Sequence, residues 1–395
     1  MKKVAVVGLY AINNAGDNIL CEATQYLIRQ IQPEVKIVEV DVNPKATAYH
    51  GLDMIPFLAS KVLIKLSTYL FSYTNSSKFR YNYEYFMWWL KINKKFQQGF
   101  KGVDAIVFAG GGFLKFRTQG LNYYVEQIVK IAEKNNIPVM MNGVGIEGYD
   151  ENDIRCQRLK KAINKDCMKV ITTRDDIDTL QNKYIVNPNT LTARVGDPAF
   201  WVPECYSVKK SKHHSDTIGI NIIRGKVYQA YGNTLSEFQL LNFYKRLIEE
   251  IEEKGWKWVL FSNGMKADQV FGKKLLQALD CNDQRKLLPA PKDTMEFIHM
   301  IRRFKCVFGA RLHACITSYA LDVPVVGLIW SEKLQIFSEV IGKPQNFFPE
   351  SRLHIEDMVQ AIENSFDDEY DAELRNDLKQ QTKMYIEKFL QKISE

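Results

Sequence analysis

The chain has 395 residues, of which 46% are hydrophobic and 25% charged, the composition of a soluble globular protein. Because one hydrophobic core rarely spans so many residues, two domains are expected. The formal net charge of +7 is modest, and lysine and arginine are scattered along the chain. This distribution favours anionic small ligands or a weak attraction to a membrane surface, and it argues against a nucleic-acid groove, for which no motif is present.

The seven cysteines include no CxxC pair, so zinc ribbons and redox dithiols are not expected. The apolar part of the first residues, MKKVAVVGLY, is too short for a signal peptide and predicts a β-strand instead. No run reaches the roughly 18 apolar residues that a membrane-spanning helix needs. We therefore expect a cytoplasmic protein with reduced thiols.

The chain begins with a predicted strand, turn and helix, the order of a ligand-binding βα unit. The strand covers Val4 to Val7, and the helix runs from about Asp17 to Ile31. The glycines between them fit neither GxGxxG nor GxxxxGK[ST], which excludes the dinucleotide-binding and P-loop motifs. Asn14 and Asp17 either contact a ligand or only build the turn and cap the helix.

A basic, aromatic segment from about residue 45 to 100 interrupts the βα alternation. Thirteen aromatic residues lie between Phe57 and Phe100, interspersed with lysines. Such a segment could lie on a lipid interface or, through Trp88 and Trp89, stack on sugar rings. Dimer packing or a helical cap on the first domain is an equally common use of such residues.

Four later strands of the first half each end in residues that can contact a ligand. The strands are Asp104 to Ala109, Val139 to Asn142, Val170 to Thr172 and Thr192 to Val195. They are followed by Gly110-Gly111-Gly112, by Gly143 and Gly145, by Arg174, and by Gly196-Asp197-Pro198. Because the carboxyl ends of parallel strands meet at one sheet edge, we expect a ligand-lined edge there. The glycine triplet would let backbone N–H groups approach a phosphate, although a tight turn is its more common explanation.

The sequence Asp176-Ile177-Asp178 matches the DxD pattern by which many sugar transferases hold a metal. Acidic residues in the first turn of a helix are, however, favoured by the helix dipole. We adopt this second interpretation and predict no metal site.

The alternation of strands and helices predicts an α/β protein of two Rossmann-like domains that face a central cleft. The second domain begins with a strand from Ile218 to Ile222 that is followed by Arg224. The final helix could cross back onto the first domain. The predicted boundaries are 1–207 for the first domain with the insertion at about 45–100, 208–216 for a polar linker, 217–368 for the second domain, and 369–395 for the last helix.

The stretch from Cys306 to Lys333 combines cationic residues with a titratable one. A short strand ends at Gly309-Ala310, and Arg311 and His313 follow at the start of a predicted helix. Unpaired N–H groups at a helix start attract anions, and an arginine adds a fork suited to phosphate or carboxylate. Lys333 follows the next strand, at the same sheet edge. The alternative is that Arg311 and His313 are capping groups or surface charges.

Several of these motifs, in this order and spacing, resemble the polysaccharide pyruvyl transferase family. They are Asn13-Asn14-x-Gly16-Asp17-Asn18, Phe108-Ala109-Gly110-Gly111-Gly112, Thr173-Arg174-Asp175, Gly196-Asp197-Pro198-Ala199, and Arg311-Leu312-His313-Ala314 with Pro324 and Lys333 downstream. The resemblance covers nearly the whole chain outside residues 45 to 100. It implies a GT-B-like fold and transfer of the enolpyruvyl unit of phosphoenolpyruvate to a sugar of a cell-surface or exopolysaccharide repeat unit, as a pyruvate ketal.

The resemblance also implies roles for individual residues. His313 is expected to be the general acid, with Arg311 and Asp17 as further catalytic groups. Donor binding is assigned to Gly110, Gly111, Gly112, Arg174, Arg224, Arg311, Lys333 and Asn14, and acceptor binding to Asp197. Trp88 and Trp89 lie outside the resemblance, and they are assigned to the acceptor as a hypothesis from the aromatic segment alone. Phosphoenolpyruvate is a co-substrate, and neither a cofactor nor a metal is expected.

Two other functions remain compatible with the sequence. The same arginine, histidine and lysine set would hold the diphosphate of a nucleotide sugar in a GT-B-type glycosyltransferase. A catalytically silent glycan-binding scaffold would keep the fold without the reaction. The expected partner is a sugar or lipid-linked oligosaccharide acceptor, met at the inner face of the membrane by a peripheral contact; no nucleic acid is expected, and an oligomer is compatible with the sequence.

Overall fold

The computed structural model describes residues 2–10, 14–44, 54–70, 78–117, 120–208 and 215–393, without the side chains of residues 64 and 67–70. Parts of the aromatic segment, most of the predicted linker, and Asn13 lie outside these residues. The chain divides into two α/β units. Unit 1 comprises Met1–Ile12, Leu20–Pro198 and Leu378–Glu395, and unit 2 comprises Asn13–Ile19 and Ala199–Asp377.

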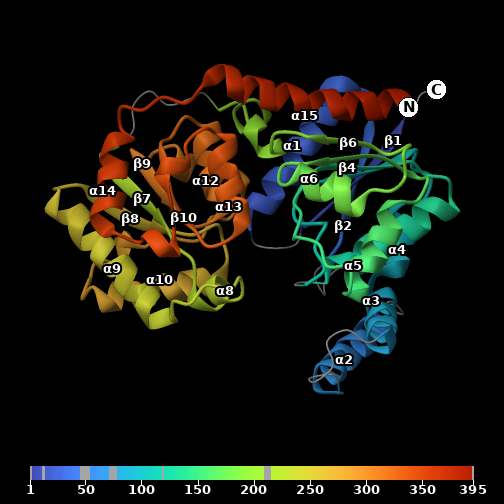
Figure 1. Cartoon of the computed structure of the whole chain (residues 1–395), viewed down its shortest axis with the longest axis horizontal. Helices are drawn as coiled ribbons and strands as arrows, with labels where there is room; N and C mark the ends of the chain where they lie inside the picture. The colour runs from blue at the N-terminus through green and yellow to red at the C-terminus, as the bar shows by residue number, and fades with distance from the viewer. Residues whose placement is uncertain are drawn as a thin grey trace. The chain divides into compact units, whose positions relative to one another are not determined.

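Unit 1 is built on a parallel sheet with the strand order β2-β1-β3-β4-β5-β6 and helices on both faces (Figure 1). Strands covered on both faces read as continuous apolar runs, and β3, with the sequence AIVFA, is buried at every residue. The strands are β1 Lys3–Gly8, β2 Lys36–Asp41, β3 Ala105–Ala109, β4 Val139–Val144, β5 Met168–Thr173 and β6 Leu191–Arg194. The helices outside the insertion are α1 Ala15–Ile31, whose residues up to Ile19 belong to unit 2, α4 Leu121–Lys134, α5 Ile154–Ile163 and α6 Ile177–Thr179.

The C-terminal helix α15, Ala372–Lys392, packs on unit 1 from Leu378 onwards. The Thr382 hydroxyl donates a hydrogen bond of 2.8 Å to the Gly196 carbonyl oxygen. A Cβ atom on Gly196 would lie 2.6 Å from the Leu378 carbonyl oxygen. Glycine at this position therefore allows the helix backbone to approach the end of β6.

Unit 2 has a second parallel sheet, with the strand order β11-β10-β9-β7-β8. Its longest helix, α9, begins with a capping box in which the Ser236 and Gln239 side chains each accept a hydrogen bond from the other residue's backbone N–H. The strands are β7 Thr217–Asn221, β8 Lys257–Phe261, β9 Cys306–Gly309, β10 Val325–Ile329 and β11 Phe347–Pro349. The helices are α7 Val202–Cys205, α8 Gly225–Gln229, α9 Glu237–Glu253, α10 Lys266–Ala278, α11 Thr294–Ile301, α12 Leu312–Ala320, α13 Glu332–Val340 and α14 Ile355–Asn364.

The predicted strands and helices are confirmed, with ends shifted by at most three residues. Asp176 caps α6, because its side chain accepts a hydrogen bond of 2.9 Å from the Thr179 N–H. This is the helix-start interpretation of the DxD sequence.

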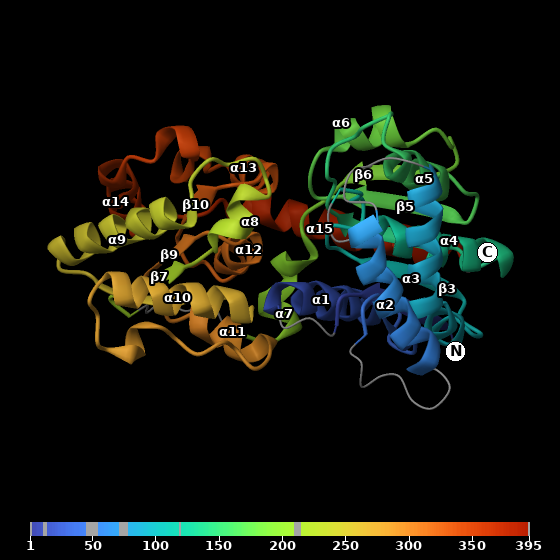
Figure 2. The ribbon, with the colours of Figure 1, turned by 90° about the horizontal axis from the view of Figure 1, so that it is seen from below.

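The described part of the insertion forms two helices, α2 Met54–Leu70 and α3 Lys78–Gly99, which lie beside each other (Figure 2). Tyr83 of α3 donates a hydrogen bond of 3.2 Å to the Leu63 carbonyl of α2. Trp88 attaches α3 to α4, because its ring meets that of Tyr124 edge-on at a centroid distance of 5.1 Å. The insertion is therefore a helical pair whose second helix packs on unit 1.

Glu126 of α4 is the buried carboxylate that joins α3 and α5 to α4. It accepts hydrogen bonds from Tyr81 of α3 and Arg158 of α5, and Lys130 lies 2.9 Å from its Oε1 atom. Burial by itself would raise the pKa of Glu126, but the hydrogen bonds from Arg158, Tyr81 and Lys130 more than offset it and hold the pKa below the usual range.

A Glu126→Gln variant should therefore destabilise the protein in a pH-dependent way. The folded-state pKa is lowered, so the carboxylate stabilises the fold above the ordinary glutamate pKa of about 4.3 and loses this effect as the pH falls through the folded value. We expect the variant to lose about 1–3 kcal/mol of unfolding free energy at neutral pH. The difference from wild type should shrink as the pH is lowered.

Denaturant unfolding measured across this pH range checks the prediction. Glu133→Gln is the matched control, because Glu133 is an exposed glutamate of the same helix, and it should change stability by less than about 0.5 kcal/mol. A stability loss in Glu126→Gln that does not vary with pH would contradict the electrostatic explanation.

Candidate active site

Two arginines of unit 2 share one fully buried carboxylate at the carboxyl edge of the sheet. Arg224 follows β7, Arg311 follows β9, and Asp268 lies in α10, which follows β8. Arg311 Nη2 lies 2.8 Å from Asp268 Oδ1 and 2.6 Å from Oδ2, and Arg224 Nη1 lies 2.9 Å from Oδ1. Because β8, β7 and β9 are consecutive in the sheet, residues far apart in the sequence meet at this edge.

The two arginines carry more positive charge than Asp268 neutralises, and among the described residues not all of their N–H groups are paired. Asp268 neutralises only one of the two positive charges, so the cluster carries a net charge of +1. Arg311 Nε is buried and has no hydrogen-bond partner among the residues that the structure describes. Both arginine side chains remain partly exposed, at 17% for Arg311 and 24% for Arg224. Two guanidinium groups that are oriented side by side in this way are suited to binding an anion.

Trp330 positions Arg311 from the end of β10. Its indole Nε1 donates a hydrogen bond to the Ala310 carbonyl, and its ring centre lies 5.9 Å from the Arg311 guanidinium carbon. Asn233 donates a hydrogen bond of 2.8 Å to the Trp330 carbonyl and holds the strand end in place. The guanidinium of Arg311 is therefore held between a carboxylate and an aromatic face.

His313, in the first turn of α12, packs directly against Gly16, in the first turn of α1. A Cβ atom on Gly16 would lie 2.4 Å from the Cβ, Cγ and Nδ1 atoms of His313. The N–H of Ala15 donates a hydrogen bond of 2.9 Å to the Asn263 carbonyl, after β8. The N-terminal motif thus belongs to the same unit as the Arg311 motif, and the glycine leaves room for the imidazole.

The side chains of Asn14 and Asp17 bond to each other and to the helix start. Asn14 Nδ2 donates a hydrogen bond of 2.8 Å to Asp17 Oδ2, and the Asn14 carbonyl accepts one of 3.1 Å from the Asp17 N–H. These are the bonds expected of turn and cap residues, and both side chains are half-buried. Lys333, in the first turn of α13 and also half-buried, follows β10 at the same sheet edge as Arg311.

The predicted donor and acceptor residues of unit 1 include one ion pair and one glycine turn. Arg174, after β5, forms an ion pair with Asp197, after β6, and both side chains are almost fully buried. Gly110 and Gly111 have φ angles of 60° and 74°, which favour glycine. The Gly110 N–H donates a hydrogen bond of 2.8 Å to the Asn142 carbonyl, so this group serves the turn. Gly112 completes the same turn and is half-buried.

The two tryptophans assigned to the acceptor have different surroundings. Trp88 packs into unit 1 beside Tyr123 and Tyr124. Trp89 is 39% exposed and lines a cavity between α3 and α4. Of this pair, Trp89 is the more exposed.

Sequence reasoning missed Asp268 and Trp330. Asp268 lies seven residues beyond β8, inside a helix, where a lone aspartate has no motif. The one available signal was the predicted convergence of two arginines on a sheet edge, since two neighbouring guanidinium groups require a counter-charge.

Comparisons with solved structures identify the fold. The chain resembles the UDP-GlcNAc 2-epimerase of Methanocaldococcus jannaschii, with 12% identity, 98% of this chain and 99% of that chain covered, and a TM-score of 0.56. The Neisseria meningitidis UDP-GlcNAc 2-epimerase bound to UDP-GlcNAc gives 12% identity, 99% and 100% coverage, and a TM-score of 0.57. The UDP-forming trehalose-phosphate synthase of Burkholderia vietnamiensis gives 9% identity, full coverage of both chains, and a TM-score of 0.51. These similarities confirm the predicted GT-B type of α/β fold.

No curated protein matches this chain by sequence. The sequence model of one family, described as polysaccharide pyruvyl transferase, matches residues 14–332. This range begins at the Asn14 turn, includes Arg224, Asp268, Arg311 and His313, and ends one residue before Lys333. The chain therefore belongs to the polysaccharide pyruvyl transferase family.

Proposed function

We propose that this protein transfers the enolpyruvyl unit of phosphoenolpyruvate to a sugar of a cell-surface or exopolysaccharide repeat unit and closes it as a pyruvate ketal. The observation that carries the proposal is the pair of arginines held on Asp268 beside the Arg311–His313 helix start. Phosphoenolpyruvate bears a phosphate and a carboxylate, and both groups are bound well by guanidinium forks. Lys333 adds a cation at the same sheet edge.

The proposed reaction begins with protonation of the methylene carbon of phosphoenolpyruvate by His313. The adjacent carbon becomes an oxocarbenium-like centre. One acceptor hydroxyl attacks this carbon and loses its proton to Asp17 or to His313. A second hydroxyl of the sugar then displaces phosphate from the same carbon and closes the ketal. The two hydroxyl protons balance the proton gained by the new methyl group and the proton taken by the leaving phosphate. Arg311 and Arg224 would stabilise the departing charge.

Donor binding is tested by thermal stabilisation of the purified protein. Phosphoenolpyruvate should raise the unfolding free energy by about 2.7 kcal/mol at a concentration 100-fold above its dissociation constant. Arg311→Ala and Arg224→Ala should each abolish most of this stabilisation. Asp268 keeps one arginine in each variant, so both should fold. Lys226→Ala, which removes an exposed lysine of α8 two residues from Arg224, is the matched control and should retain the effect.

The same titration distinguishes the alternatives when it is repeated with UDP, GDP and inorganic phosphate. Stabilisation by a nucleoside diphosphate but not by phosphoenolpyruvate would move the assignment to a nucleotide-sugar glycosyltransferase. No stabilisation by any of them would favour a glycan-binding scaffold.

The role of His313 is tested by phosphate release from phosphoenolpyruvate in the presence of polysaccharide acceptors. His313→Gln should lower kcat by about 10²–10⁴-fold while phosphoenolpyruvate still binds, because general-acid catalysis typically contributes that much. Gly16→Ala should lower kcat in the same direction, since its methyl group would displace the imidazole. His299→Gln, at an exposed histidine of α11, should leave kcat unchanged. Full activity of His313→Gln would rule out the assigned proton donor.

We further propose that α2 rests on an anionic membrane and brings the protein to a lipid-linked acceptor at the cytoplasmic face. Among the described residues no helix combines the length and hydrophobicity required to cross a bilayer. Four exposed apolar side chains nevertheless share one face of α2, at Ile55, Leu58, Val62 and Leu66. The helix contains lysines and no acidic residue. Exposed apolar area flanked by cations is typical of an interfacial helix.

Co-sedimentation with vesicles tests this contact. The wild type should sediment with vesicles of phosphatidylcholine and phosphatidylglycerol, and less at high salt, because salt screens the lysines. Leu58→Glu and Val62→Glu should abolish the association. Val270→Glu, at an exposed valine of α10, is the matched control. Equal sedimentation of all variants, or none for the wild type, would refute the contact.

A further inference from the structure

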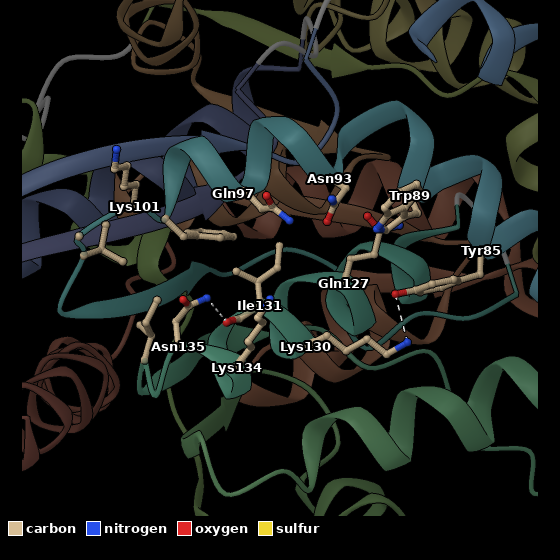
Figure 3. A pocket seen from close by; sticks show the side chains of 14 residues that line it. Tyr85, Trp89, Asn93, Gln97, Lys101, Gln127, Lys130, Ile131, Lys134 and Asn135 are labelled. Atoms are coloured by element: carbon tan, nitrogen blue, oxygen red, sulfur yellow. Dashed lines mark hydrogen bonds between the residues drawn. The ribbon is translucent and has the colours of Figure 1, made fainter. Parts of the chain in front are cut away.

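A cavity of about 570 Å³ lies in unit 1 between α3 and α4 (Figure 3). This volume is within the range of small-molecule sites. It is lined from α3 by Tyr85, Trp89, Asn93 and Gln97, from α4 by Gln127, Lys130, Ile131 and Lys134, and at one end by Phe100 to Val103, Asn135 and Ile137. None of these residues belongs to the proposed donor site, which lies in unit 2.

The two helices present polar stripes to each other across this cavity. The lining residues of α3 recur every four positions from Tyr85 to Gln97, so they share one side of the helix. The next positions around α3, Ile92 and Phe96, are apolar and fully buried. Figure 3 shows the side chains of Asn93, Gln97 and Gln127 directed into the space between the helices. A packed helix interface would instead place apolar residues on such a stripe.

Gln127 is the observation that points to a ligand. Its side chain is 1% exposed, and among the described residues neither its amide oxygen nor its amide nitrogen has a hydrogen-bond partner. A buried polar group without a partner destabilises the fold, because it has lost its hydrogen bonds to water. An amide that carries this cost in the wall of a cavity is poised to bond to a molecule that enters it.

The charged side chains that line the cavity favour an anionic ligand. Three lysines, Lys101, Lys130 and Lys134, line it, and the lining contains no aspartate or glutamate. Lys130 is held by Glu126 at 2.9 Å and by the Tyr85 hydroxyl at 3.1 Å, whereas Lys101 and Lys134 are exposed. The lining of the cavity therefore combines cationic side chains with neutral amides.

The aromatic residues of the lining favour a ligand that contains a sugar ring. Tyr85 and Trp89 lie one helical turn apart on α3 and precede the amides of Asn93 and Gln97 along the helix. An indole face packs well on the C–H face of a pyranose, and amides bond to its hydroxyl groups. Aromatic, amide and lysine side chains together match a sugar that bears a carboxylate.

We propose that the cavity between α3 and α4 binds an acidic sugar residue of a polysaccharide. This inference rests on the proposed function for its biological ligand, because a pyruvyl transferase converts a neutral sugar into one that bears a carboxylate. A site for the acidic product would keep the enzyme on a chain that it has already modified. The binding of an acidic glycan by the isolated protein does not depend on the reaction.

Isothermal titration with a galacturonic acid trisaccharide and with its neutral galactose counterpart tests the proposal. The acidic trisaccharide should bind at least about tenfold more tightly than the neutral one. Trp89→Ala, Gln127→Leu and Lys134→Ala should each weaken its binding about tenfold or more. Lys94→Ala, at an exposed lysine of α3 outside the lining, should bind as the wild type does.

Gln127→Leu separates a binding role from a structural one. Replacing an unpaired buried amide by an apolar side chain of similar size should leave the thermal midpoint unchanged or raise it, while the affinity falls. Equal binding of both trisaccharides, no binding of either, or unchanged affinity in the three cavity variants would overturn the proposal. The titration contains no phosphoenolpyruvate, so loss of donor binding and loss of glycan binding are separate results.

Discussion

The buried carboxylate of Asp268 is the constraint on which the unit 2 site depends. A charge with no exposure to water is stable only when it is paired, and here two guanidinium groups pair with it from neighbouring strand ends. In return, the carboxylate fixes both arginines side by side, which their mutual repulsion would otherwise oppose. The pair is thus oriented before any ligand binds, so the arginine side chains would lose little conformational entropy on binding an anion.

A second constraint, the lack of a side chain at Gly16, joins two distant motifs. The first turns of α1 and α12 approach so closely that even one methyl group would overlap His313. The Asn263 carbonyl holds the start of α1 in this position through the Ala15 N–H. The glycine of the N-terminal motif and the histidine of the later motif, almost 300 residues apart in the sequence, are therefore in direct contact.

The fold could be predicted from the sequence because its signals are local. Apolar runs such as AIVFA and the glycines after them set the strands and turns, and the helices between them follow from apolar periodicity. The outline of the site could also be predicted, since strand ends in parallel sheets share an edge. Its pairings could not: Arg174 and Arg311 have equivalent places after strands, and only the structure distinguishes the nearly buried Arg174–Asp197 pair from the arginine pair on Asp268. Side-chain partners across a sheet edge depend on tertiary geometry that no local pattern contains.

Among the described residues, some buried polar groups are paired and others are not, and two neighbours on α4 illustrate the difference. Glu126 has three hydrogen-bond donors, which join α3, α4 and α5, so its charge stabilises the fold. One residue further along α4, the Gln127 amide is just as buried and has no partner among the described residues. Arg311 combines both kinds, because its Nη2 is bound to Asp268 while its Nε has none. Unpaired hydrogen-bonding groups cost stability, and those of Gln127 and Arg311 lie in a cavity wall and at a sheet edge, which are places where a ligand can bond to them.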